Sequence, residues 1–93
     1  MVASRMKDKF TVVISDNLDK ILKKLKRKNP QIVIEIKSQI FKIIKFPEIG
    51  KPLRYNMKNS RRVHIGSFVL VYKIINNEIH FLDFDHHDNV YKK

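Results

Sequence analysis

Three consecutive segments decide the fold of this chain: Ser60-Arg-Arg-Val-His-Ile-Gly66, Phe68-Val-Leu-Val-Tyr-Lys-Ile-Ile75 and Glu78-Ile-His-Phe-Leu-Asp-Phe-Asp85. Each has the length of a strand, and many of their apolar residues are β-branched or aromatic, as strands prefer. The pairs Gly66-Ser67 and Asn76-Asn77 separate them, and Gly and Asn accept the positive φ angles of tight turns. We therefore expect the last third of the chain to form a three-stranded antiparallel meander.

Two amphipathic helices are predicted before the meander. The run Phe10-Thr-Val-Val-Ile14 has the composition of a strand, and Ser15-Asp16-Asn17 directly after it favours a helix N-cap. Leucine and isoleucine then recur at helical spacing, and lysines gather toward the end of the segment, where cations interact favourably with the helix dipole. Asn29-Pro30 begins a second helix, which Phe46-Pro47 ends. So short a connection predicts an antiparallel helical hairpin.

The order of these elements, β-α-α-β-β-β, predicts an α+β fold in which an antiparallel sheet of about four strands packs on the N-terminal helical hairpin. We expect the first strand at an edge of the sheet. The 93 residues contain no repeat and no linker, so residues 1–93 are expected to form a single domain. Ile32, Ile34 and Phe41 lie off the apolar stripe of the second helix, which indicates contact with the sheet or with another protein.

The chain is strongly basic, with a net charge of +11, and this charge is unevenly placed. Residues 1–62 hold 17 Lys and Arg against five Asp and Glu, whereas residues 63–93 hold three against four. A positive field attracts polyanions, so RNA, DNA, an acidic protein and anionic lipid are the candidate partners. The alternative is that lysines on solvated helix faces serve solubility alone.

The absence of cysteine excludes disulfides and thiolate metal sites, and it fits a reducing cytoplasm. Met1–Lys9 lacks the apolar run of a signal peptide, and no segment approaches the ~20 apolar residues that span a bilayer. We therefore expect a soluble, cytoplasmic protein with no membrane partner.

One face of the first meander strand carries chemically useful side chains. Alternation along the strand directs Val63 and Ile65 to the core. It directs Ser60, Arg62 and His64 to the opposite face. A guanidinium can donate two parallel hydrogen bonds to a phosphate, and an imidazole titrates near neutrality. This face is therefore a candidate phosphate-handling surface; the alternative is that these residues only keep the open side of a half-buried sheet soluble.

His86, His87 and Tyr91 lie where the last strand ends and the chain becomes polar. Imidazole and phenol groups serve as general acids and bases, so these side chains are candidates for proton transfer. A metal site that includes the nearby aspartates is the competing interpretation. We expect no metal, because adjacent histidines on an extended chain point apart and their spacing matches no established metal motif. A frayed polar C-terminus is a third interpretation.

The segment from Glu48 to Asn59 is predicted to be a basic loop that carries Lys51, Arg54 and Lys58. The chain has no Gly-rich phosphate loop, and no serine has the sequence context of a nucleophile. If the protein is an enzyme, we therefore expect its substrate to supply the nucleophile.

Three strings occur in an order that matches a known family: Pro47-Glu-Ile-Gly-Lys-Pro-Leu-Arg54, then Arg61-Arg-Val-His-Ile-Gly66 with Phe68-Val-Leu-Val-Tyr72, then His86-His-Asp-Asn-Val-Tyr91. The family pattern is roughly a Gly-Lys-Pro-Leu-Arg loop, a basic strand leading to Tyr-Arg-Leu-Val-Tyr, and a closing His-Arg-x-x-x-Tyr. On these strings the chain resembles the RelE/ParE superfamily of type II toxins over nearly its whole length.

The resemblance implies a RelE-like mRNA interferase, a ribosome-dependent endoribonuclease that cleaves mRNA in the ribosomal A site and inhibits translation. In that reaction the RNA 2′-hydroxyl attacks the adjacent phosphate, so the enzyme needs an acid, a base and cations but no metal or other cofactor. The family's C-terminal tyrosine and one strand cation correspond to Tyr91 and Arg62, and we expect these two residues and His87 to be catalytic. The predicted RNA contacts are Lys51, Arg54, Lys58, Arg61, His64 and His86.

The resemblance also implies a cognate, RelB-like antitoxin whose helices wrap the toxin in a hetero-oligomer, in addition to the ribosome and mRNA. Three departures from the family pattern favour an alternative. Val69 and His87 stand where the family carries arginine, and Ser60 stands at an outward position expected to carry a cation. The alternative is a ParE-like toxin of the same fold that inhibits DNA gyrase without cleaving RNA.

Overall fold

The computed structural model describes residues 10–52 and 59–92, with side chains described through Val90. The strands are β1 (Thr11–Ile14), β2 (Lys51–Pro52), β3 (Ser60–Ile65), β4 (Phe68–Ile75) and β5 (Glu78–His86). The helices are α2 (Asp16–Lys28), α3 (Pro30–Lys45), the short 3-10 helix η1 (Pro47–Ile49) and α4 (His87–Lys92). None of these helices is long and apolar enough to cross a membrane.

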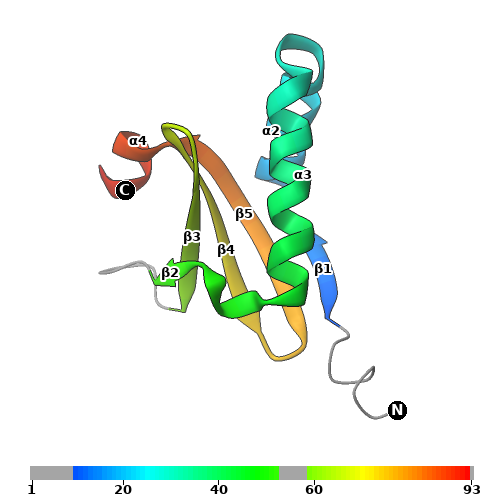
Figure 1. Ribbon diagram of the computed structural model, residues 1–93, viewed down its shortest axis with the longest axis vertical. Coiled ribbons are helices and arrows are strands. Elements are labelled where there is room, and N and C mark those ends of the chain that lie inside the picture. Colours follow the sequence, from blue (N-terminus) through cyan, green and yellow to red (C-terminus); the bar gives the residue numbers. More distant parts are fainter. Residues whose placement is uncertain (1–9, 53–58, 93) are drawn as a thin grey trace.

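The strands form one sheet in the order β1-β5-β4-β3-β2, and α2 and α3 pack together against one side of it (Figure 1). The predicted α+β class, helical hairpin and three-stranded meander are confirmed, and β1 lies at the expected edge. The sheet differs from the prediction in having five strands and in being mixed, because β1 pairs in parallel with β5 while the other pairs are antiparallel. The two helices carry the chain across the sheet, so that β5 returns beside β1 in the same direction.

Side-chain hydrogen bonds fix where the two long helices begin. Ser15 Oγ accepts from the amide of Leu18 at 3.0 Å and donates to the carbonyl of Leu82 at 2.8 Å, which ties the start of α2 to β5. Asn29 Oδ1 accepts from the amide of Ile32 at 3.3 Å. The proline that follows Asn29 begins α3, where its missing N–H leaves no helical hydrogen bond unmade. Both predicted caps are confirmed.

The main core lies between the helices and the sheet face that they cover. A second, smaller cluster lies on the opposite face, where Val69, Val71 and Val90 are buried beside Leu82. β4 is therefore buried on both faces, which accounts for its unbroken apolar sequence. The face that was expected to be open is partly covered by α4, which contributes Val90. The buried residues of the main core are Leu18, Ile36, Ile43, Ile65, Leu70, Tyr72, Ile79, Phe81 and Phe84.

Tyr72 holds the segment between α3 and β3 in place. Its hydroxyl donates to the carbonyl of Pro47 at 2.6 Å and accepts from the amide of Gly50 at 2.9 Å. From β3, Arg61 Nη1 donates to the carbonyl of Gly50 at 2.7 Å and to that of Glu48 at 3.2 Å. We call Tyr72, Gly50 and Arg61 the loop anchor. It fixes the chain directly before β2, and β2 in turn pairs with β3.

The loop anchor predicts a pH-dependent contribution of Tyr72 to stability. Burial raises the pKa of the Tyr72 phenol above its usual 10.0, so the folded state holds the phenolic proton more tightly than the unfolded chain does. This stabilisation is complete below about pH 10 and falls as the pH rises beyond that value. Denaturant unfolding of wild type and Tyr72→Phe measures it.

The difference in the free energy of unfolding between wild type and Tyr72→Phe is expected to be about 1–3 kcal/mol near neutral pH, because the variant leaves a buried amide without its acceptor. It is expected to be smaller near pH 11. The two proteins differ in this side chain alone, so effects of alkaline pH on the rest of the chain cancel in the comparison. A difference that stays constant from neutral to alkaline pH would contradict this account of Tyr72.

Candidate functional site

A small recess beside β3 brings three of the predicted site residues together. It has a volume of about 190 Å³, and its polar lining is formed by Lys51, Arg62 and His64. β2 places Lys51 directly opposite Arg62, and the alternation of β3 puts Arg62 and His64 on one face. The recess therefore combines two permanent cations with an imidazole, a combination suited to holding a phosphate and moving a proton beside it.

Arg62 is held in position by the short strand β2. Its Nη1 donates to the carbonyl of Pro52 at 3.0 Å and contacts that of Lys51 at 3.4 Å. The side chain is half-buried, and its cross-strand neighbour Val71 is fully buried. A guanidinium fixed in this way loses less side-chain entropy when it meets a phosphate than a mobile surface cation does.

Arg61 lies on the opposite face of β3, where it pairs across the sheet with Tyr72 and forms part of the loop anchor. Its observed contacts are backbone carbonyls of the segment that leads into β2. The structure thus gives Arg61 a part in positioning β2, while its predicted contact with RNA stays a prediction.

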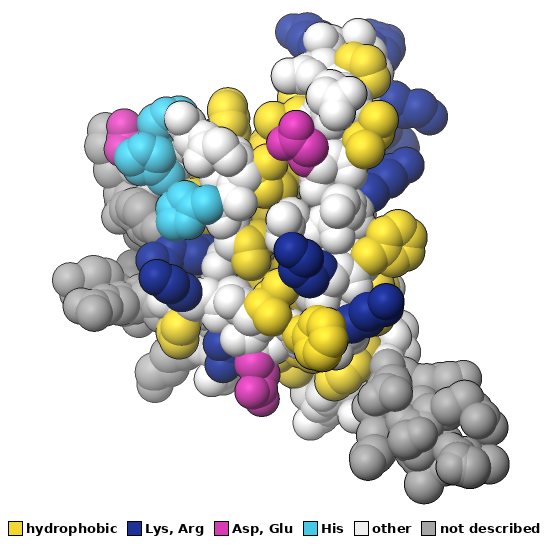
Figure 2. Space-filling view, in the orientation of Figure 1, with side chains coloured by type: hydrophobic (Ala, Val, Ile, Leu, Met, Phe, Trp, Pro, Cys, Tyr) yellow, Lys and Arg dark blue, Asp and Glu magenta, His cyan; other side chains and the backbone are white. Residues whose placement is uncertain are grey.

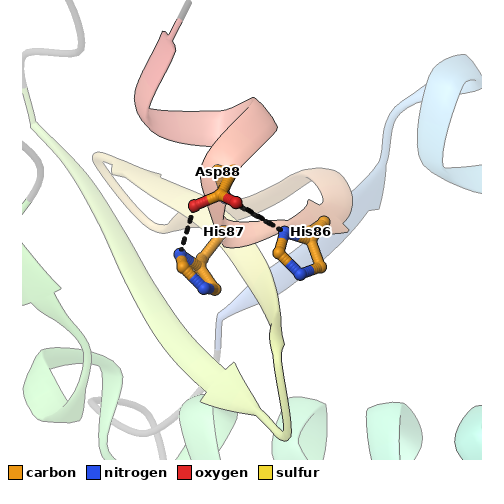
Figure 3. Close-up of side chains that lie close together, drawn as sticks. All are labelled: His86, His87 and Asp88. Atoms are coloured by element: carbon orange, nitrogen blue, oxygen red, sulfur yellow. Dashed lines mark hydrogen bonds and ion pairs between the residues drawn. The ribbon is translucent and has the colours of Figure 1, made fainter.

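His86 and His87 lie together at the junction of β5 and α4 (Figure 3). Their ring centroids are 4.6 Å apart and their planes are inclined by 27°. The carboxylate of Asp88 contacts both rings, at 3.1 Å from Nδ1 of His87 and at 3.7 Å from Nδ1 of His86. The expectation that adjacent histidines point apart was wrong, because a helix begins at His87 and bends the chain at this point.

Several contacts hold this junction in place. Asp85 Oδ1 accepts from the amide of His86 at 2.7 Å and from the side-chain amide of Asn89 at 3.1 Å. The amide of His87 donates to the carbonyl of Ser67 in the β3–β4 turn at 3.1 Å. One turn further on, the burial of Val90 packs α4 against β4. The histidine pair therefore sits on a fixed strand end and not on a frayed terminus.

Most of the predicted site residues within the described parts of the chain lie on one side of the molecule. Figure 2 shows histidine side chains gathered on the side that carries β3 and α4, next to a group of Lys and Arg side chains. Tyr91 is part of α4, but its side chain lies outside the described residues, as do Arg54 and Lys58.

Sequence reasoning considered Asp88 only as one of three aspartates near the histidines that could ligate a metal, and it missed the loop anchor. Asp88 follows the histidines directly, so a helix start at His87 was the signal that would have revealed the contact. The loop anchor joins Gly50 to Tyr72, which lies 22 residues further along the chain. No local pattern in the sequence reports such a pair.

Comparison with known proteins identifies the family of this chain. Residues 9–91 match the family described as the ParE toxin of the type II toxin-antitoxin system parDE. The chain therefore belongs to this family, and the resemblance to the RelE/ParE superfamily that the sequence strings carried is confirmed.

One curated protein and several solved structures are similar to this chain over most of its length. A protein of Methanocaldococcus jannaschii that carries the name RelE4 is 40% identical over 87 residues, which make up 90% of this chain and 93% of the relative. The toxin-antitoxin complex RelBE2 from Mycobacterium tuberculosis contains a similar chain, with a TM-score of 0.70 and 26% identity over 83% of this chain and 96% of that one. The YoeB/ParE toxin from Agrobacterium tumefaciens has a TM-score of 0.76 at 15% identity, over 84% and 99% of the two chains, and shows the fold alone.

Proposed function

We propose that this toxin is a ribosome-dependent endoribonuclease that cleaves mRNA in the ribosomal A site and so inhibits translation. The observation that carries the proposal is the recess in which Lys51, Arg62 and His64 meet. A groove with fixed cations and an imidazole suits a phosphodiester that is about to gain negative charge. The name RelE4 of the relative with 40% identity supports the same activity.

The reaction needs little from the protein because the RNA supplies the nucleophile. The 2′-oxygen of the nucleotide forms a bond to the adjacent phosphorus, the bond from phosphorus to the 5′-oxygen breaks, and a 2′,3′-cyclic phosphate remains. A base takes the proton of the 2′-hydroxyl, and an acid gives one to the departing 5′-oxygen. We assign the stabilisation of the phosphorane to Arg62, and we assign proton transfer to His87 and Tyr91.

Further RNA contacts are assigned to the basic residues in and around the recess. Lys51 and His64 line it together with Arg62, and His86 stacks on His87. Such contacts position the substrate and make binding dependent on salt. The remaining assigned contacts are Arg54, Lys58 and Arg61.

A cognate antitoxin is the second partner that we propose. The similar chain from Mycobacterium tuberculosis was solved within a toxin-antitoxin complex. On α3 of this chain, the side chains of Ile34 and Phe41 are 60% and 68% exposed. An antitoxin helix with apolar and acidic side chains would cover them and neutralise neighbouring lysines. The active species would then be a cytoplasmic toxin released from a hetero-oligomer.

A gyrase inhibitor without nuclease activity is the second candidate function, and one observation favours it. Val69, which stands where the superfamily strand carries arginine, is fully buried and packs with Val71 and Val90. The centre of this sheet face therefore holds an apolar contact in place of a cation. The family that the chain matches is also that of the parDE system.

One experiment with two arms tests both functions. A translation extract with a defined mRNA receives the purified toxin, and primer extension maps new 5′ ends; cleavage within codons occupying the A site is expected. In parallel, purified gyrase is assayed for supercoiling with the same toxin preparation. Intact transcripts together with blocked supercoiling would refute the nuclease and establish the second candidate.

A further inference from the structure

We propose that His86, His87 and Asp88 form a binding site for a transition metal ion of the zinc class at the junction of β5 and α4. These three side chains are the one group of three or more potential metal ligands found together in residues 10–52 and 59–90. Each offers one ligand atom, and the three atoms lie within 4.8 Å of one another. The site shares His86 and His87 with the activity proposed above, but the observations behind it do not depend on that activity.

The distances in the cluster are close to those that a metal requires. Zinc binds imidazole nitrogen and carboxylate oxygen at about 2.0–2.2 Å, so tetrahedral ligand atoms lie about 3.4 Å apart. The carboxylate oxygens of Asp88 already lie 3.1 Å from Nδ1 of His87 and 3.7 Å from Nδ1 of His86. The backbone amide of Asp88 donates to Nδ1 of His86 at 3.2 Å, so side-chain rotations that release this bond would bring all three groups onto one ion.

The side chains are accessible enough to make that adjustment. The exposed fractions are 39% for the side chain of His86, 42% for that of His87 and 63% for that of Asp88. Figure 3 shows both rings turned toward the carboxylate of Asp88. The ion would reach the site from solvent, and water would complete its coordination.

The backbone beneath the cluster is ordered before any metal binds. The carboxylate of Asp85 accepts hydrogen bonds from the amide of His86 and from the side chain of Asn89, which joins β5 to α4. These contacts hold the backbone that carries the three ligands in one position. Burial of Val90 against β4 holds the helix in the same position.

The ligand set selects the class of metal. Two imidazoles and one carboxylate suit zinc, copper, nickel and cobalt, whereas magnesium and calcium prefer sites made only of oxygen. Affinity along this series is expected to follow the usual order, with copper above zinc and nickel, and manganese weakest.

Metal binding would also affect the reaction if the proposed nuclease activity is correct. Zinc on Nδ1 of His87 would fix the ring and place positive charge beside Nε2, so zinc would inhibit cleavage in which His87 accepts a proton. This consequence rests on the proposed function, while the binding site itself does not.

Calorimetric titration of the untagged full chain with zinc chloride tests the site without using activity. One zinc ion per chain is expected, and the His86→Ala/His87→Ala double variant and Asp88→Asn should each lose affinity by tenfold or more. His80→Ala is the matched control, because His80 also contacts a carboxylate, that of Glu78, at 2.8 Å but belongs to no group of three.

The melting temperature of each protein supplies a second measurement. Zinc is expected to raise that of wild type and His80→Ala and to leave that of the double variant unchanged, because a ligand stabilises only the state that binds it. Melting in EDTA verifies that each variant is folded. Equal zinc affinity for wild type and the double variant, or loss of the bound ion in His80→Ala, would overturn the proposal. Zinc binding without any effect on mRNA cleavage would leave the site in place and refute the assignment of His87 to proton transfer.

Discussion

Replacement of Arg62 by alanine is expected to lower the rate of mRNA cleavage by about 10²–10³-fold, the usual loss when one preorganised donor to a developing charge is removed. The phosphorane carries more negative charge than the substrate phosphate does, so the guanidinium acts mainly on the rate constant. Arg62→Lys is expected to recover part of the loss, because lysine restores the charge without the planar fork. Single-turnover cleavage on programmed ribosomes measures both variants.

The control for charge is Arg27→Ala, which removes the same side chain from the exposed last turn of α2. Its cleavage rate is expected to stay within about threefold of wild type, since exposed charges far from the reacting phosphate are screened by salt. Arg62→Ala also removes the hydrogen bonds to β2, so its unfolding free energy is expected to fall by about 1 kcal/mol. A folded Arg62→Ala that cleaves at the wild-type rate would contradict the assigned role, and so would an equal loss in Arg27→Ala.

The sequence predicts those parts of the fold that depend on a few neighbouring residues, such as helix caps and turns. The cap residues Ser15 and Asn29 set the helix starts because their side chains bond to amides three residues away. The meander follows from its turn residues, and Asn76 adopts the expected positive φ of 54°. The parallel pairing of β1 with β5 was not predictable, because it depends on where the two helices return the chain to the sheet. Neither local propensity nor periodicity contains that information.

The candidate site follows from the sequence only in part. Alternation along β3 predicts that Arg62 and His64 share a face, and in the structure they line the same recess. The partner strand β2 is two residues long, too short for a periodic signal, so its effect on Arg62 was not predictable. The contact between the rings of His86 and His87 depends on α4, a helix of only six residues. Short helices depend on tertiary packing, here through Val90, more than on their own propensity.

The buried position of Val69 is incompatible with the arginine that the family pattern carries there. Arginine at this position would place a charge on a side chain that is 0% exposed in this chain, and burial of an unpaired charge is strongly unfavourable. The apolar residues Val69, Val71 and Val90 thus form a consistent set in which α4 packs onto β4. In this chain, Val69 thus allows α4 to pack closely onto the centre of this sheet face.

Replacement of Gly50 by alanine is expected to have the largest effect on stability, a loss of about 2–4 kcal/mol in the free energy of unfolding. A Cβ at this position would lie 2.6 Å from the hydroxyl of Tyr72, 2.7 Å from Cε1 of its ring and 3.0 Å from the carbonyl of Arg62. Tyr72 is fully buried and cannot move aside. The chain before β2 must therefore shift and lose its hydrogen bonds to Tyr72 and Arg61. The melting temperature should fall by roughly 10–25 °C.

Two further variants separate this contact from a general sensitivity of glycine positions. Gly66→Ala places its Cβ in open space but keeps a φ of +64°, so it is expected to cost only about 1–2 kcal/mol through backbone strain. Gly50→Ala combined with Tyr72→Phe removes the hydroxyl from the clash, and the double variant should lose less stability than the two single variants together. Denaturant unfolding of the four proteins and wild type measures these differences. Additive losses would show that the hydroxyl of Tyr72 takes no part in the clash. A Gly50→Ala variant as stable as Gly66→Ala would show that Tyr72 does not require glycine at this position.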